Sequence, residues 1–233
     1  MSTLLAHPCA PRGKFIVLEG PDGSGKTTAA AYLTRALNAA GAHTVQTHEV
    51  GGTAVGASLR KLIFSPPEDE TIDPVARLLM ALASRIQNIR TNIEPLLDKG
   101  INVVCDRFSL STQVYQGRID KLNFMLTDLE NIQEMRFAAL RPDHLLFFDV
   151  SVQTAMARAA ARPGTDNTHY KNDLAKTKAV IEHYRECVGR NSREGTGGKT
   201  LTRIDANAAL EMVQGELDRF VKTFMRPLTA VLA

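Results

Sequence analysis

A glycine-rich loop followed by a lysine and two threonines is the most chemically suggestive stretch of the sequence. Residues 15–28 read FIVLEGPDGSGKTT, in which Gly20 to Thr27 fit the pattern G-x-x-x-x-G-K-[ST]. Glycines let backbone N–H groups approach a polyphosphate, and the following helix turns its positive N-terminal end toward the same anion. The pattern predicts nucleotide binding through Gly20, Gly23, Ser24, Gly25, Lys26, Thr27 and Thr28.

Single residues around this loop indicate a more specific chemistry. Lys26 is expected to reach the β- and γ-phosphates, and Thr27 to place its hydroxyl on Mg²⁺. Asp106 ends the apolar run INVVCD, where a carboxylate can hold Mg²⁺ directly or through water. Arg107 follows it. An arginine cannot act as a base but can clamp a phosphate, which favours transfer to a phosphorylated acceptor over hydrolysis.

Apolar strand-like runs alternate with helical patterns, which predicts one α/β domain built on a parallel sheet. The predicted strands are Phe15–Glu19, His43–His48, Ile101–Asp106, His144–Val150 and Thr200–Asp205. The predicted helices are Lys26–Ala40, Thr53–Phe64, Pro74–Leu97, Ile119–Leu140, Val152–Ala161, Asn172–Arg190 and Ala206–Met225, while a polar, aromatic segment after Arg107 and residues 191–199 are predicted to be loops. Ligands bind beyond the carboxyl ends of parallel strands, and the candidate residues follow such ends.

The composition limits the class of protein and the partners that can be expected. A length of 233 residues with 44% hydrophobic and 23% charged residues suits a globular domain, and a net charge of +3 is too small to indicate a nucleic-acid polymer as partner. The 3 cysteines are far apart, which is typical of a reduced, cytoplasmic protein, and no apolar run is long enough for a membrane span. Residues 1–14 are interpreted as an N-terminal extension that could be disordered, and 15–233 as the domain.

The segment 74–97 has two distinct faces. Apolar residues recur every three or four positions and predict a buried stripe: Val75, Leu78, Leu79, Leu82, Ile86, Ile89, Ile93 and Leu96. Ala81, Arg85, Asn88 and Asn92 form a second, polar face. Periodicity alone favours a solvated Arg85.

Taken together, these motifs resemble those of the thymidylate kinase family, from about Phe15 to the C-terminal helix. The resemblance rests on the glycine loop, Glu49-Val50-Gly51-Gly52-Thr53 with Leu59-Arg60, Ala83-Ser84-Arg85, Asp106-Arg107 to Tyr115-Gln116, Arg141-Pro142-Asp143 and Ile204-Asp205-Ala206. It implies a three-layer P-loop kinase fold with a five-stranded parallel sheet flanked by helices and a small lid at about 157–170. It also implies transfer of phosphate from ATP·Mg²⁺ to dTMP, and a homodimer packed through helices such as 74–97.

The resemblance further implies roles for individual residues. Asp22 would act on the acceptor's 3′-hydroxyl or through Mg²⁺, and Glu49 would lie near the phosphates and the metal. Arg60 and Arg107 would hold the acceptor monophosphate. The remaining acceptor contacts would be Arg85 to the pyrimidine O4, Thr112 and Gln116 to the base edge, and Tyr115 under the deoxyribose.

The lid is expected to supply a catalytic arginine. Some family members carry this arginine in the P-loop, at the position that Gly23 holds here. Arg158 and Arg162 would then neutralise transition-state charge, and Arg162 is the better candidate because it lies at the loop itself.

The sequence departs from the family at the acceptor base. Ala81 stands where a phenylalanine usually stacks on thymine, and His48, Val50 and Asn167 replace a common Arg, Pro and Arg. Either Phe108, Met80 or Leu82 fills the space, or the pocket accepts a bulkier base. We therefore expect a kinase that converts dTMP to dTDP. The alternatives are a kinase for dUMP, 5-substituted dUMP or a broader set of deoxynucleotides, and, more remotely, a nucleotide-binding protein without catalysis.

Overall fold

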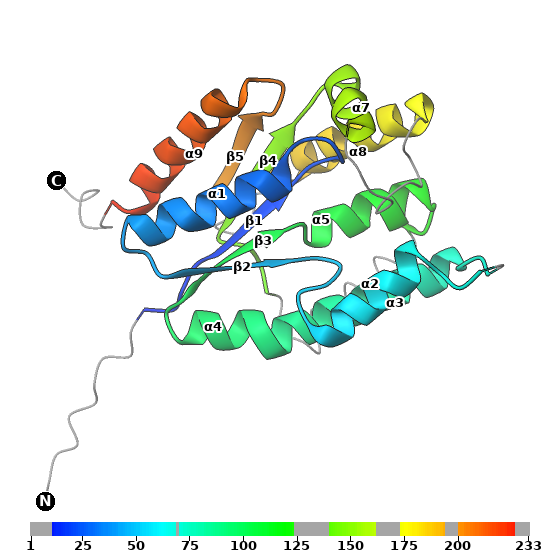
Figure 1. The fold of residues 1–233 in the computed structure, drawn as a ribbon, viewed down its shortest axis with the longest axis horizontal. Helices are drawn as coiled ribbons and strands as arrows, with labels where there is room; N and C mark the ends of the chain where they lie inside the picture. Colours follow the sequence, from blue (N-terminus) through cyan, green and yellow to red (C-terminus); the bar gives the residue numbers. More distant parts are fainter. Residues whose placement is uncertain (1–10, 69, 124–139, 162–172, 194–199, 227–233) are drawn as a thin grey trace, which may run out of the picture.

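The computed structural model describes residues 11–68, 70–123, 140–161, 173–193 and 200–226. Its centre is a five-stranded sheet in the order β2-β3-β1-β4-β5, in which every pair of neighbours is parallel (Figure 1). The strands are β1 Phe15–Glu19, β2 Thr44–His48, β3 Asn102–Asp106, β4 His144–Asp149 and β5 Thr200–Asp205. The predicted three-layer α/β fold is confirmed.

Helices cover both faces of the sheet. They are α1 Lys26–Ala39, α2 Ala54–Phe64, α3 Pro74–Asn88, the π-helical η1 Ile89–Ile93, α4 Glu94–Asp98, α5 Ser109–Thr112, the π-helical η2 Gln113–Ile119, α7 Val152–Ala160, α8 Leu174–Arg193 and α9 Leu210–Phe224. One core cluster joins the sheet to α1 and α9, and a second joins it to η1, α4, η2 and α8. None of the helices that the structure describes combines the length and apolarity needed to cross a membrane.

Strand β1 shows how the sequence builds these two layers. Successive side chains of a strand point to opposite faces of the sheet. Ile16 and Leu18 accordingly belong to the cluster under α1, whereas Phe15 and Val17 belong to the cluster on the opposite face. A strand buried on both faces needs a continuous apolar run, which is what FIVL provides.

The long predicted helix 74–97 contains a π-helical turn that periodicity did not reveal. The wider turn η1 separates α3 from α4, and Pro95 lies in the first turn of α4. Proline has no N–H to donate, and its ring clashes with the carbonyl four residues earlier. The wider turn accommodates that clash without ending the helix.

The segment after Arg107 is also helical, so its prediction as a loop is wrong. Here α5 and η2 run from Ser109 to Ile119. The predicted helix Ile119–Leu140 and the predicted extension 1–14 lie mostly on residues outside the description. Of the predicted loop 191–199, the first three residues belong to α8, because this helix runs on to Arg193, and 194–199 lie outside the described residues. Within the described part of that extension, the Gly13 N–H donates to the Leu97 carbonyl at 2.8 Å.

The burial of α3 departs from the simple prediction at particular positions. On the apolar stripe Leu78 is fully buried, as predicted, but Leu79 is 49% exposed. Arg85 and Asn88, on the polar face, are buried. The prediction of a solvated Arg85 is therefore wrong. The face of α3 that carries Arg85 points to the interior. It can do so because residues directly after β2 and in α5 form hydrogen bonds with the Arg85 side chain there, as described below.

Replacing Leu33 on α1 by alanine tests the first core cluster. Leu33 is fully buried between α1 and the sheet. We expect Leu33→Ala to lower the free energy of unfolding by about 2–5 kcal/mol, through lost burial and a residual cavity. Urea denaturation measures this loss.

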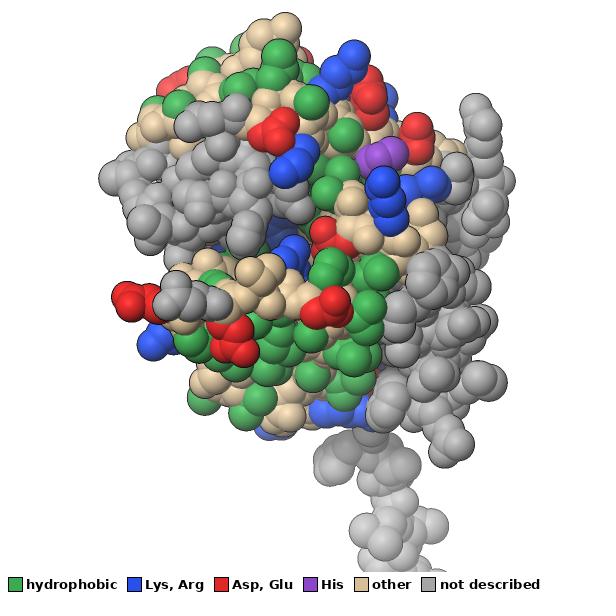
Figure 2. Space-filling view, turned by 90° about the vertical axis from the view of Figure 1, so that its right-hand side faces the viewer, with side chains coloured by type: hydrophobic (Ala, Val, Ile, Leu, Met, Phe, Trp, Pro, Cys, Tyr) green, Lys and Arg blue, Asp and Glu red, His purple; other side chains and the backbone are tan. Residues whose placement is uncertain are grey.

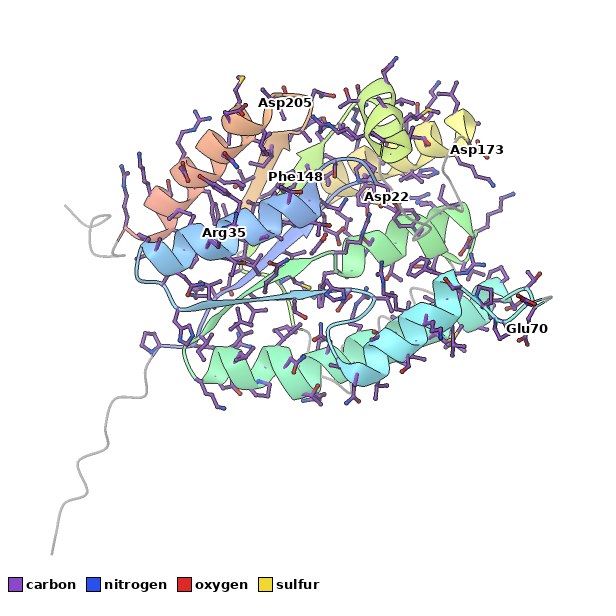
Figure 3. All side chains as sticks on the ribbon, in the orientation of Figure 1. Asp22, Arg35, Glu70, Phe148, Asp173 and Asp205 are labelled. Carbon is purple, nitrogen blue, oxygen red and sulfur yellow. The ribbon has the colours of Figure 1, made fainter. Side chains whose placement is uncertain are left out.

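The matched control lies on the same helix. Arg35, labelled in Figure 3, is exposed. Arg35→Ala is expected to change the free energy of unfolding by no more than about 0.5 kcal/mol. Equal effects of the two substitutions would contradict the assigned packing of α1.

Candidate active site

The glycine loop joins β1 to α1 at the carboxyl edge of the sheet. Gly20, Gly23 and Gly25 all have positive φ, a conformation that other residues adopt at a cost. A Cβ added to Gly25 would meet nothing within 4 Å, so the backbone there faces open space. The loop can thus present its N–H groups to a phosphate, as predicted.

Lys26 begins α1 with its amine turned back into the loop. Its Nζ lies 2.6 Å from the Pro21 carbonyl oxygen and 3.1 Å from Ser24 Oγ. Burial, reinforced by the positive charge of Arg107, lowers the pKa of Lys26 to about 7. An anion beside this amine would stabilise its charged form.

Thr27 and Asp106, the two predicted magnesium ligands, are hydrogen-bonded to each other. The Thr27 hydroxyl donates to Asp106 Oδ2 at 2.6 Å. Asp106 Oδ1 is buried and has no hydrogen-bond partner among the described residues. A hydroxyl and a carboxylate oxygen beside a polyphosphate are the donors that Mg²⁺ prefers, so the residues present fit this ion.

Arg107 lies between the P-loop and α5. It forms an ion pair with Asp22, labelled in Figure 3, and its Nη1 donates to the Gly20 carbonyl at 3.1 Å. The guanidinium carbon lies 5.5 Å from the centre of the Tyr115 ring, and the Tyr115 hydroxyl donates to Asp22 at 3.4 Å. The structure therefore brings these three predicted residues into one cluster.

Arg85 forms a second cluster with two other predicted residues. Its Nε donates to Glu49 Oε2 at 2.6 Å, and its Nη2 donates to Thr112 Oγ1 at 2.7 Å. All three side chains are buried, and within the part of the chain that the structure describes Glu49 Oε1 has no hydrogen-bond partner. Burial raises the pKa of Glu49 to about 7, against the opposing effect of the Arg85 charge.

A loop after β2 connects these clusters to α2. Arg60, on α2, donates to the Val50 carbonyl at 3.0 Å. His48 precedes Glu49 on β2, and burial and the nearby charge of Arg60 lower its pKa. On the other side of the loop, the Gly51 N–H donates to Ser84 Oγ of α3 at 3.1 Å.

The residues expected to contact the acceptor base near Ala81 differ in whether their side chains are already engaged in the core. Ala81 is buried on α3. Phe108 packs edge-on against Phe15, with ring centres 5.1 Å apart, and lies 5.0 Å below the guanidinium carbon of Arg85. Its ring is thus engaged in the core. Gln116, one turn beyond Thr112 in η2, is partly buried.

The structure describes one of the two predicted lid arginines. Arg158 ends α7 and donates to the carbonyls of Ala206 (2.6 Å) and Ala208 (3.5 Å), between β5 and α9. Arg162 lies outside the described residues. A Cβ at Gly23 would lie 2.3 Å from the Ala155 carbonyl oxygen of α7, so this position has no room for an arginine.

Sequence reasoning missed three residues behind Arg107. Glu19, Ser111 and Tyr184 are hydrogen-bonded to one another or to Arg107. A carboxylate at the end of a buried apolar strand was the available signal for Glu19. Tyr184 lies in α8, far along the chain, and its sequence context gives no such signal.

Seen from the side, this edge of the molecule is hollowed between an upper and a lower half (Figure 2). Basic and acidic side chains line the floor of the hollow in that view. The described residues that are predicted to bind phosphate lie in, or directly next to, β1, β2, β3, α1 and α2. Such a groove suits an elongated anionic ligand.

Comparison with known proteins agrees with this geometry. A sequence model described as thymidylate kinase matches residues 18–217. Relatives named thymidylate kinase include one from Pseudomonas fluorescens (strain Pf0-1), 35% identical over 213 residues that cover 91% of this chain and 97% of the relative. The chain belongs to the thymidylate kinase family.

Two other bacteria supply similar relatives of the same name. The thymidylate kinase of Bordetella pertussis (strain Tohama I) is 35% identical over 215 residues, 91% of this chain and 96% of the relative. That of Exiguobacterium sibiricum is 32% identical over 214 residues, 92% and 96% of the two chains. Family membership thus extends over nearly the whole chain, which confirms the resemblance.

Alanine at Gly23 tests the contact between the P-loop and α7. Both Gly23 and Gly25 have positive φ, so alanine at either position costs about 1–2 kcal/mol of backbone strain. Only Gly23 has α7 against it. We expect Gly23→Ala to lose about 1–3 kcal/mol more than Gly25→Ala, because backbone must move to admit the methyl group. Urea denaturation without nucleotide measures both, and equal losses would contradict the contact.

Proposed function

We propose that this chain transfers the γ-phosphoryl group of ATP to dTMP, giving ADP and dTDP. The observation that carries the proposal is the convergence of Lys26, the Thr27–Asp106 pair and Arg107 at one edge of the sheet. Donor phosphates would lie on the P-loop, and an acceptor phosphate beside Arg107. The names of the relatives favour dTMP as the acceptor.

In this proposal the protein positions two anions and neutralises the charge that develops between them. An acceptor phosphate oxygen attacks the γ-phosphorus in line as the bond to the β–γ bridging oxygen breaks, so no general base is needed. Lys26 neutralises charge on the donor side, while Arg107 and Arg60 hold the acceptor phosphate. Asp22 holds Arg107 and Tyr115, and Arg85 is the donor to the base.

The lid is proposed to add the last positive charge. The close contact of Gly23 with α7 and the engagement of Arg158 with two carbonyls both support Arg162 as the arginine at the transferred group. Arg158 is the second candidate. Bound between Thr27 and Asp106, Mg²⁺ would supply the electrostatic neutralisation that phosphoryl transfer requires.

The small side chain of Ala81 is the reason to test a broader range of acceptors. The side chain is small and buried, and Phe108 is engaged with Phe15 and Arg85. Met80 and Leu82 are the other residues that can border the base. A wider pocket would accept 5-substituted dUMP as well as dTMP.

A coupled ADP-release assay tests the acceptor. Each nucleoside monophosphate is offered separately with ATP·Mg²⁺, including dUMP and 5-hydroxymethyl-dUMP. We expect the highest kcat/KM for dTMP. Equal or better turnover of another monophosphate would overturn the acceptor assignment while leaving the phosphoryl transfer intact.

Lys26→Ala tests whether the P-loop is catalytic. Removing a charge that stabilises the transition state is expected to lower kcat by about 10²–10³-fold. Lys222→Ala, at an exposed position on α9, is the control and should leave kcat unchanged. Absence of turnover by the unmodified protein with every monophosphate would support the non-catalytic alternative.

We also propose a homodimer formed through the apolar stripe of α3. Leu79 on α3 and Val55 and Leu62 on α2 are large apolar side chains with 42–52% exposure. Hydrophobic side chains gather on the lower half of the face shown in Figure 2. A second copy would bury these exposed apolar side chains of α2 and α3 against its own, as two-fold symmetric dimers do.

Light scattering coupled to gel filtration tests the dimer. Leu79→Glu should shift the protein to monomers, because it places a charge in the buried interface. Met212→Glu is the control: Met212 is also exposed, on α9, and should leave the mass unchanged. A monomeric unmodified protein would overturn the proposal.

The three cysteines support a cytoplasmic location. In the part of the chain that the structure describes, Cys105 and Cys187 are both buried. This usage suits a reducing compartment.

A further inference from the structure

A buried polar cluster lies directly behind Arg107. It consists of Glu19 at the end of β1, Ser111 in α5 and Tyr184 in α8. Glu19 and Tyr184 are fully buried. The roles proposed above for phosphate, metal and base binding use none of the three, and a buried carboxylate and hydroxyl are costly unless they are bonded.

The hydroxyls of Ser111 and Tyr184 share the Glu19 carboxylate. Ser111 Oγ donates to Glu19 Oε2 at 2.7 Å, and Tyr184 Oη donates to the same oxygen at 3.4 Å. The two hydroxyl oxygens are themselves hydrogen-bonded at 2.8 Å. Arg107 Nη1 then donates to Tyr184 Oη at 3.0 Å and to Ser111 Oγ at 3.1 Å. The Glu19 carboxylate thus anchors both hydroxyls, and their oxygens face the guanidinium.

Glu19 also fixes the backbone that follows Arg107. Its Oε1 accepts from the Phe108 N–H at 2.8 Å and from the Ser111 N–H at 3.0 Å. A carboxylate in this place satisfies the free N–H groups at the start of α5. Arg107 itself has φ of 72°, which is strained for an arginine, so the surrounding contacts must hold it there.

We propose that Tyr184 is a positioning residue: with Glu19 and Ser111 behind it, its hydroxyl aims the Arg107 guanidinium at the acceptor monophosphate. The inference rests on the proposed function, in which Arg107 holds that phosphate. Unlike Asp22, these hydroxyls hold Arg107 from the interior of the domain. They fix its direction without placing another negative charge where the phosphate must bind.

The tyrosine ring alone does not account for this arrangement. The ring of Tyr184 stacks on Phe147 and meets Tyr115 edge-on, both with ring centres 6.2 Å apart. A phenylalanine would make the same ring contacts. Only the hydroxyl reaches Arg107 and Ser111, so the packing and positioning roles can be separated by one atom.

Tyr184→Phe is therefore the test, with Tyr32→Phe as the matched control. Tyr32 donates its hydroxyl to Asp218, between α1 and α9 and away from Arg107. Calorimetry measures the affinities of each protein for dTMP, for thymidine, which lacks the phosphate, and for an ATP analogue. Steady-state kinetics adds KM for dTMP and kcat.

We expect Tyr184→Phe to weaken dTMP binding and raise its KM by about 5- to 30-fold, the loss of one hydrogen bond to a charged group. Binding of thymidine and of the ATP analogue should change less than about twofold by the same reasoning, because neither uses the acceptor-phosphate contact. Tyr32→Phe should leave all three affinities unchanged. Ser111→Ala should act in the same direction as Tyr184→Phe.

Two results would overturn the inference. One is unchanged dTMP affinity in Tyr184→Phe, and the other is an equal loss for dTMP, thymidine and the ATP analogue, which would indicate general loosening. Binding is measured without turnover, so the proposed reaction can fail separately. An unmodified protein that binds dTMP tightly but does not phosphorylate it would contradict the reaction and leave the binding comparison valid.

Discussion

The hydrogen bonds and the ion pair of one largely buried guanidinium, that of Arg107, hold the candidate site together. Arg107 is only 18% exposed, and a charge in that position is tolerable only when oxygens surround it. Those oxygens come from the P-loop (the Gly20 carbonyl and Asp22), from Ser111 of α5 and from Tyr184 of α8. Because these partners come from three segments, the P-loop, α5 and α8 cannot move independently without leaving the charge of Arg107 without some of its partners.

The strand order explains how two nucleotides can be handled at one edge. In the order β2-β3-β1-β4-β5, the P-loop follows the central strand. The clusters of Arg107 and Arg85 lie toward β3 and β2, whereas Arg158 engages the segment after β5 on the opposite side. In the proposed reaction a donor on the P-loop would extend toward β4 and β5 and the acceptor would occupy the other half, so that the reacting phosphates would meet in the middle.

The α3 helix shows where periodicity misleads. An apolar stripe normally faces the core, yet Leu79 is exposed while Arg85 is buried with Glu49 and Thr112. Periodicity indicates which residues share a face of the helix. It does not indicate which face packs against the rest of the protein. A buried arginine is stable only when particular acceptors arrive from elsewhere in the chain, and no local pattern in α3 encodes them.

The fold class, the five strands, the P-loop and the proximity of Thr27 and Asp106 could be predicted from the sequence. They follow from local spacing: glycines that permit positive φ, an apolar run buried on both faces, and residues placed at the carboxyl ends of parallel strands. The inward turn of Arg85, the helix after Arg107, and the positions of Glu19 and Tyr184 next to that arginine could not be predicted in this way. Each depends on hydrogen bonds between residues far apart in sequence, whose geometry is set only when the sheet and its helices have packed.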